Sequence, residues 1–84
     1  MSYKLYILQR AQKELFNLPE DSYGRIKASI NDLANDPRPH GCLKLAGREG
    51  WRIRVGNYRV IYEIDDDGQK VTILHVGHRR DVYR

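Results

Sequence analysis

The residues of this 84-residue chain best suited to chemistry are arginines on two short segments of alternating polarity. The segments flank Gly56–Asn57, a dipeptide typical of a β-hairpin turn. A two-residue turn pairs Arg54 with Arg59, and because side chains opposite each other share a face, Arg52 joins them. Like charges directly opposite each other destabilise a sheet. We therefore expect an anion at this face, and a phosphate backbone is the obvious candidate.

The C-terminal end of the chain supplies further groups of the same kind, namely His78, Arg79, Arg80, Tyr83 and Arg84. Histidine has an unperturbed pKa of about 6.5 and can carry a proton near neutrality, whereas arginine, with a pKa above about 12, is a poor base. By chemistry alone, His78 is the better proton carrier. Tyr83, placed between arginines, is suited to stacking on a base near a phosphate, or to anchoring the tail on the fold.

Other classes of chemistry lack the residues they need. His40 and Cys42 are a weak pair for a metal, and no second pair accompanies them. No serine lies in a nucleophile elbow and no glycine-rich phosphate loop is present, so we expect no metal and no cofactor. We expect His75 to be a structural histidine in the core or at its rim. The acidic run Asp65–Asp67 is expected to be a solvated loop tip.

Composition supports an anionic partner. The net charge is +4, from 15 basic and 11 acidic residues, and six of the ten arginines follow Trp51. Arginine's planar fork suits bidentate contact with phosphate. We expect a single domain over residues 1–84, with no membrane span and no signal peptide. The single cysteine, Cys42, fits a reducing cytoplasm.

The elements that must position these groups follow from periodicity and turn residues. We expect a strand over Tyr3–Leu8, a helix over Arg10–Leu18, a second helix from Glu20 that ends before Asp36–Pro39, a loop over His40–Gly50, the hairpin, and a last strand over Lys70–His78. The order is βααβββ. It predicts an α+β fold in which a helical hairpin packs on one face of a mostly antiparallel four-stranded sheet.

A second turn at Asp67–Gly68 predicts the register of the last strand: Ile64 faces Val71, Tyr62 faces Ile73 and Val60 faces His75. The face toward the helices then holds Trp51, Ile53, Val55, Tyr58, Val60, Tyr62, Ile64, Val71 and Ile73. The opposite face holds Arg52, Arg54, Arg59, Ile61, Glu63, Thr72, Leu74, Val76 and His78. An odd-length turn would shift the last strand, because a slip of one residue moves every side chain to the other face.

Several segments together resemble the RelE/ParE superfamily of toxin-antitoxin toxins, and its RelE branch most closely. The matching segments are Arg10–Leu15, Leu18–Pro19, Leu43–Gly47, Trp51–Tyr62 and Val76–Tyr83, which extend over nearly the whole chain. The helical part is generic, whereas the hairpin and the C-terminal motif are specific in combination. The resemblance implies a small βααβββ protein that enters the ribosomal A site and cuts mRNA. In this family the RNA's own 2′-hydroxyl attacks the adjacent phosphate without a metal.

The resemblance also implies roles for particular residues. The implied catalytic residues are Arg54, Arg59, His78, Arg79 and Tyr83, and the implied RNA-binding residues are Lys44, Arg52, Arg80 and Arg84. In the most studied RelE toxins the first two basic positions of the hairpin are lysines, and one of them is a candidate base. Both are arginines here, which moves proton transfer toward His78 or Tyr83.

The implied partners are a cognate antitoxin, the ribosome and mRNA, with no membrane and no small-molecule cofactor. The antitoxin's expected docking sites are the exposed Ile61, Leu74 and Val76, or the outer surface of the helical hairpin. The alternative function is that of a ParE-like DNA gyrase poison without nuclease activity. ParE-type chains usually lack the combined arginine, histidine and terminal tyrosine, which favours the nuclease. A third hypothesis is a protein that only binds RNA, or a decayed toxin that retains only the scaffold.

Overall fold

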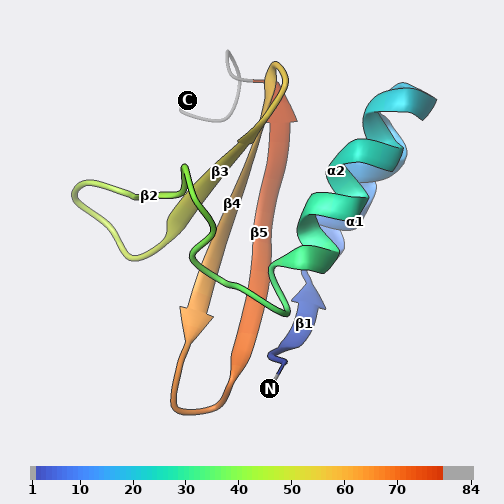
Figure 1. The fold of residues 1–84 in the computed structure, drawn as a ribbon. Coiled ribbons are helices and arrows are strands. Elements are labelled where there is room, and N and C mark those ends of the chain that lie inside the picture. Colours follow the sequence, from blue (N-terminus) through green and yellow to red (C-terminus); the bar gives the residue numbers. More distant parts are fainter. Residues whose placement is uncertain (1, 79–84) are drawn as a thin grey trace.

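Two helices pack against one face of a five-stranded sheet in the computed structural model, which describes residues 2–78 (Figure 1). The elements are β1 (Lys4–Ile7), α1 (Gln9–Phe16), α2 (Glu20–Asp32), β2 (Leu43–Lys44), β3 (Trp51–Val55), β4 (Tyr58–Asp65) and β5 (Lys70–His78). The strand order is β1-β5-β4-β3-β2. Neighbours are antiparallel except β1 and β5, which run parallel. The expected α+β fold is confirmed.

Local sequence accounts for both helices. α1 directs Ala11 and Leu15 into the core. α2 starts after Pro19, whose missing N–H costs no helical hydrogen bond at that position. Glu20 and Asp21 occupy its first turn, where negative charge is favourable toward the helix dipole. The two helices therefore form the expected helical hairpin.

The core lies between the helices and the sheet. The helices contribute Ala11, Leu15, Ile26 and Ile30, and the sheet contributes Ile53, Val60, Tyr62, Val71, Ile73 and Val76. Tyr62 is fully buried, and its hydroxyl donates a 2.7 Å hydrogen bond to the carbonyl of Pro37. Burial raises the pKa of this phenol. The predicted helix-facing residues of β3 and β4 are confirmed, since each lies in this core or packs against it.

The sheet has one strand more than expected. The segment His40–Gly50, interpreted as a loop, contains β2, a two-residue strand at the edge of the sheet. β2 pairs with the start of β3, so that Leu43 faces Arg52 and Lys44 faces Trp51. Such a short edge strand carries no period-two pattern, and sequence periodicity has nothing to detect there.

The register between β3 and β4 is the predicted one, with Arg54 opposite Arg59 and Val55 opposite Tyr58. Between β4 and β5 the prediction holds only as far as the pair Tyr62 and Ile73. The register then shifts by one residue, because Leu74 has no partner on β4 and forms a β-bulge.

Beyond the bulge three predictions for β5 are wrong. Val60 faces Val76 rather than His75, and Val76 belongs to the core with 1% of its surface exposed. His78 faces Tyr58 and thus shares the helix side of the sheet. His75 faces Ile61 and shares the side of the arginines. A bulge adds one residue to one strand, so every later side chain changes face.

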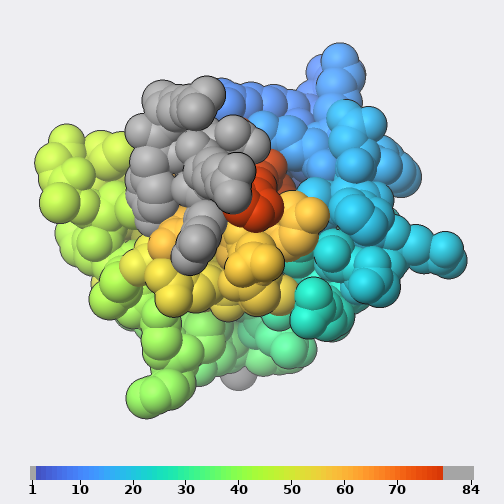
Figure 2. Space-filling view, turned by 90° about the horizontal axis from the view of Figure 1, so that it is seen from above, coloured from blue at the N-terminus to red at the C-terminus, as the bar shows by residue number. Residues whose placement is uncertain are grey.

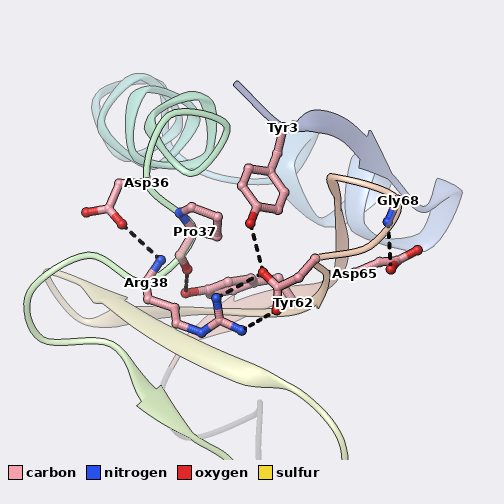
Figure 3. Close-up of polar contacts among 8 residues, drawn as sticks. Tyr3, Asp36, Pro37, Arg38, Tyr62, Asp65 and Gly68 are labelled. Atoms are coloured by element: carbon pink, nitrogen blue, oxygen red, sulfur yellow. Dashed lines mark hydrogen bonds and ion pairs between the residues drawn. The ribbon is translucent and has the colours of Figure 1, made fainter. Parts of the chain in front are cut away.

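Asp66 ties three segments together at the end of the sheet that carries the β4–β5 loop (Figure 3). It accepts hydrogen bonds from the Tyr3 hydroxyl at 2.8 Å and from both terminal nitrogens of Arg38 at 3.1 and 2.9 Å. The Arg38 guanidinium lowers the pKa of this carboxyl. The residues Asp65–Asp67 are exposed, as expected of a loop tip, but Asp66 also has this structural role.

Candidate functional site

Arg54 and Arg59 form the centre of the candidate site. They are directly paired across β3 and β4, with Gly77 of β5 opposite Arg59 on its other side. Gly77 has no side chain, so the side chains of this row are the two guanidinium groups. Arg54 is exposed, whereas Arg59 is half-buried and its Nε atom is fully enclosed. Arg54 also borders a cleft of about 300 Å³ between α2 and β3.

The next row on the same face holds Arg52, Ile61 and His75. Arg52 is half-buried, and Ile61, its partner on β4, is only 3% exposed. The Nδ1 atom of His75 lies 2.6 Å from Oε2 of Glu14 on α1. This close contact places His75 against α1, although the two groups do not align as a hydrogen bond. His75 is therefore held in the structure, as expected, but on the arginine face rather than in the core.

His78 does not share the face of the arginines. Its ring meets the ring of Tyr58 edge-on, with centroids 5.7 Å apart and an interplanar angle of 80°. The row of Tyr58 and His78 is nevertheless the last of the sheet and lies next to the row of Arg54 and Arg59. The basic groups thus converge on the end of the sheet, around the Gly56–Asn57 turn, and not on one face.

Arg25 of α2 belongs to the same region and is missed by sequence reasoning. Gly56 has a positive φ of 59°, and a Cβ atom there would lie 3.4 Å from Nη2 of Arg25. Figure 2 looks down on this end, with the yellow hairpin between the red end of β5 and the teal residues of α2. In the sequence Arg25 is one more polar residue of an amphipathic helix. Only the packing of α2 on the sheet brings it to the turn.

The remaining predicted residues have different positions. Lys44 is exposed on β2 with Nζ 5.5 Å from the centre of the Trp51 ring, on the side of the sheet opposite Arg52. Arg79, Arg80, Tyr83 and Arg84 lie outside the described residues. Among residues 2–78, no three or more His, Cys, Asp or Glu side chains are placed to hold a metal ion. In the same part of the chain, neither helix has the length and apolar character to cross a membrane.

Comparison with known proteins connects this geometry to a family. A family model described as the ParE toxin of the type II toxin-antitoxin system parDE matches residues 5–83. The chain belongs to the RelE/ParE superfamily of toxins. Toxin RelG of Mycobacterium tuberculosis is 34% identical to this toxin over 88 aligned positions, which include all of the toxin and 99% of RelG.

Solved structures of the RelE branch share the toxin's fold. The archaeal RelE–RelB complex from Pyrococcus horikoshii contains a chain 30% identical to it, with a TM-score of 0.84 over 98% of the toxin and all of that chain. The toxin-antitoxin complex RelBE2 from Mycobacterium tuberculosis contains a chain 28% identical, with a TM-score of 0.83 over 94% of the toxin and all of that chain. The toxin is therefore RelE-like.

The outer surface of the toxin's helical hairpin carries exposed aromatic area. Phe16 is 76% exposed, and its ring stacks on Tyr23 with centroids 6.2 Å apart. A cleft of about 270 Å³ adjoins them, lined also by Leu15 and Lys27. By contrast, Ile61 and Val76 are buried, so the expectation that they are exposed for docking is wrong. Leu74, the third residue of that expected site, is half-buried at the bulge.

Proposed function

We propose that this toxin is a ribosome-dependent endoribonuclease that inhibits translation by cleaving mRNA in the ribosomal A site. The observation that carries the proposal is the pair Arg54 and Arg59, which lie directly opposite each other on β3 and β4 at the end of the sheet. Two guanidinium groups at neighbouring positions can bind the non-bridging oxygens of one phosphate through charge-assisted hydrogen bonds. Because its proposed partner is the ribosome, we also propose that the toxin acts in the cytoplasm.

The proposed reaction needs only groups of the RNA and of the protein. The 2′-hydroxyl of one nucleotide attacks the adjacent phosphorus, its proton passes to a base, and the P–O5′ bond breaks. The products are a 2′,3′-cyclic phosphate and a 5′-hydroxyl, so the leaving oxygen must receive a proton. Arg54 and Arg59 would hold the non-bridging oxygens and stabilise the charge that develops on them. Arginine is a poor proton donor or acceptor, which leaves proton transfer to His78 or Tyr83.

The arrangement of the basic groups favours a substrate that crosses the end of the sheet. Arg54 and Arg59 approach this end from one face, whereas His78 approaches it from the helix side beside Tyr58. A phosphodiester lying across the Gly56–Asn57 end is within the reach of both sets, which a backbone lying along one face is not. Arg79 and Tyr83 follow His78 in the sequence, and their catalytic roles rest on the family resemblance.

Flanking basic residues would supply affinity without sequence preference. We assign RNA-backbone binding to Lys44, Arg52, Arg80 and Arg84. Contacts of lysine and arginine with phosphates release counterions, so binding that depends on them weakens as salt rises. Arg52 lies in the next row on the same face as the central pair, and Lys44 extends basic charge to the β2 edge of the sheet.

We also propose that the cognate antitoxin docks on the outer surface of the helical hairpin. The similar chains of known structure include toxins bound to their RelB antitoxins. On this toxin, Phe16 and Tyr23 offer apolar area, and Lys27 beside the cleft offers a positive charge. An amphipathic antitoxin helix with an apolar stripe and flanking acidic residues matches both features.

The test is induction of the toxin in a bacterial host, followed by mapping of mRNA 5′ ends. We expect cuts within translated codons that disappear, with growth arrest, in Arg59→Ala. Lys4→Ala removes the same charge at the other end of the sheet and should cut like the wild type. Undiminished cleavage by Arg59→Ala overturns the site assignment. Intact messages together with DNA damage and inhibited gyrase overturn the nuclease in favour of the ParE-like alternative.

A further inference from the structure

The outer edge of β5 changes partner midway along the strand. β1 pairs with β5 only from Lys70 to Ile73, and the last bond of this side runs from the Leu8 amide to the Ile73 carbonyl at 3.0 Å. Within the described residues no strand covers the edge of β5 beyond that point. The chain instead turns into α1, which lies beside the second half of β5 (Figure 1). An uncovered strand edge leaves backbone N–H groups without partners.

Glu14 of α1 completes this edge with its side chain. Its Oε1 atom accepts the backbone N–H of Val76 at 2.9 Å, and its Oε2 atom lies 2.6 Å from Nδ1 of His75. The Nε atom of Arg10, one helical turn earlier, lies 3.5 Å from the same oxygen. The Glu14 side chain is 25% exposed, so the carboxylate is largely enclosed between α1 and the strand. The Glu14 carboxylate therefore contacts two consecutive residues of β5, His75 through its imidazole and Val76 through its backbone N–H.

The two residues held by Glu14 come directly after the bulge at Leu74. Without a bulge, Val60 would face His75, and every later residue of β5 would change face. Successive N–H groups of a strand point to alternate sides, so a slip of one residue turns the Val76 N–H from α1 toward β4. The bond from Val76 to Glu14 is thus compatible with the bulged register and incompatible with the regular one.

We propose that Glu14 is a positioning residue that selects the bulged register at the end of β5. Its carboxylate thereby holds His78 on the side of Tyr58 and leaves Gly77 beside Arg59. Glu14 acts through the strand and has no contact with RNA. The consequence for cleavage rests on the proposed nuclease function, whereas the choice of register does not. Sequence gives no sign of this role, because Glu14 is one of several charged residues on α1.

The experiment compares wild type, Glu14→Ala and Glu14→Gln by NMR. We expect cross-strand contacts between Val60 and Val76, and a slowly exchanging Val76 amide, in the wild type. Glu14→Gln retains a hydrogen-bond acceptor and should keep both the Val60–Val76 contacts and the slow exchange of the Val76 amide. Glu14→Ala should lose the protection of Val76 and show Val60 paired with His75. Glu20→Gln is the control, since Glu20 is exposed at the start of α2, and it should match the wild type.

Single-turnover cleavage of ribosome-bound mRNA is then measured on the same variants. We expect Glu14→Ala to lose on the order of 10²-fold in rate with unchanged binding, as small misplacements of catalytic groups do, and Glu14→Gln to recover most of it. If Glu14→Ala keeps the bulged pairing, the proposal is overturned, whatever its rate of cleavage. A shifted pairing with an unchanged rate overturns the positioning role.

Two further outcomes are kept apart by this design. Absence of cleavage by the wild type overturns the nuclease function, while the pairing data still decide whether Glu14 selects the register. If Glu14→Ala fails to fold, the pairing and exchange data of the wild type and of Glu14→Gln test the proposal. Rapid exchange of the Val76 amide in the wild type, or loss of the bulged pairing in Glu14→Gln with the rate retained, contradicts the proposal.

Discussion

Arg54 on β3 and Arg59 on β4 stand directly opposite each other at the end of the sheet, where both strands meet the Gly56–Asn57 turn. Like charges directly opposite each other repel, which lowers the stability of the folded chain relative to a pair with one neutral side chain. The pair persists in a small domain with limited stability to spare, since chains of this size bury only roughly 60% of their unfolded surface. Two arginines so placed are consistent with a site that binds a phosphate.

Neutralising one member of the pair should stabilise the free toxin. We expect Arg54→Gln to raise the free energy of unfolding by about 0.2–1 kcal/mol at low salt, and by less at high salt, because ions screen the repulsion. Urea denaturation at two salt concentrations measures both values. Arg52→Gln is the matched control, because Arg52 faces the uncharged Ile61. A destabilised Arg54→Gln with an unaffected control would contradict the repulsion between Arg54 and Arg59.

Removal of the imidazole at the sheet end should slow chemistry more than binding. We expect His78→Gln to lower the single-turnover cleavage rate by about 10²–10⁴-fold, the usual contribution of general acid–base catalysis, with RNA affinity retained. His75→Gln serves as the comparison, because His75 is engaged by Glu14 on the other face. A rate within about twofold of the wild type for His78→Gln would transfer the proton-carrying role to Tyr83.

Arg25 should contribute to RNA binding from the helix side of the turn. We expect Arg25→Ala to weaken binding of a short RNA at low salt and to reduce the slope of log affinity against log salt by about one phosphate contact. Filter binding over a salt series measures this slope. Lys27→Ala on the same helix removes a charge that lines the outer cleft instead, and the slope should not change. Equal slopes for the two variants would exclude Arg25 from the interface.

Asp66 should make stability depend on pH on the acid side. The hydrogen bonds from Arg38 and Tyr3 lower its pKa in the folded chain, so folding is favoured by the ionised carboxylate. This contribution is complete above the unfolded pKa of roughly 4 and is lost as the pH falls through the lower folded value.

Urea denaturation at pH 7, 5 and 3 tests this dependence. We expect Asp66→Asn to be destabilised at pH 7 and to lose less stability than the wild type on acidification, because it has no carboxylate to protonate. Asp67→Asn, in the same loop but outside the network in Figure 3, should retain the wild-type dependence. Parallel curves for the wild type and Asp66→Asn would contradict the assignment.

Phe16 tests the antitoxin surface independently of catalysis. Since 76% of Phe16 is exposed, Phe16→Ser should leave the fold and the toxicity unchanged. We expect it to weaken antitoxin binding about tenfold or more, as loss of an aromatic anchor does, so that co-expressed antitoxin no longer restores growth. Leu43→Ser makes a similar change on β2, at the opposite edge of the sheet from α1. If the antitoxin still neutralises the Phe16→Ser toxin fully, the docking site lies elsewhere.

Much of the fold was predictable because it follows from local patterns. The stripe of Ile26, Ile30 and Leu33 indicated the buried side of α2, and the Gly56–Asn57 turn determined the pairing of Arg54 with Arg59. The arginine pair, on which the candidate site rests, could therefore be predicted from the sequence alone. β2 was not, because its pairing depends on a neighbour and not on its own two residues.

The sequence by itself determined the element order, the helix-facing residues of β3 and β4, and the paired arginines, since each depends on periodicity and turn chemistry within a short stretch of chain. Only the tertiary structure decided which histidine faces which side. The bulge at Leu74 exchanges His75 and His78 between the two faces, and its register is compatible with a bond to Glu14, which lies 62 residues away from Val76. A contact across that separation leaves no trace in local sequence.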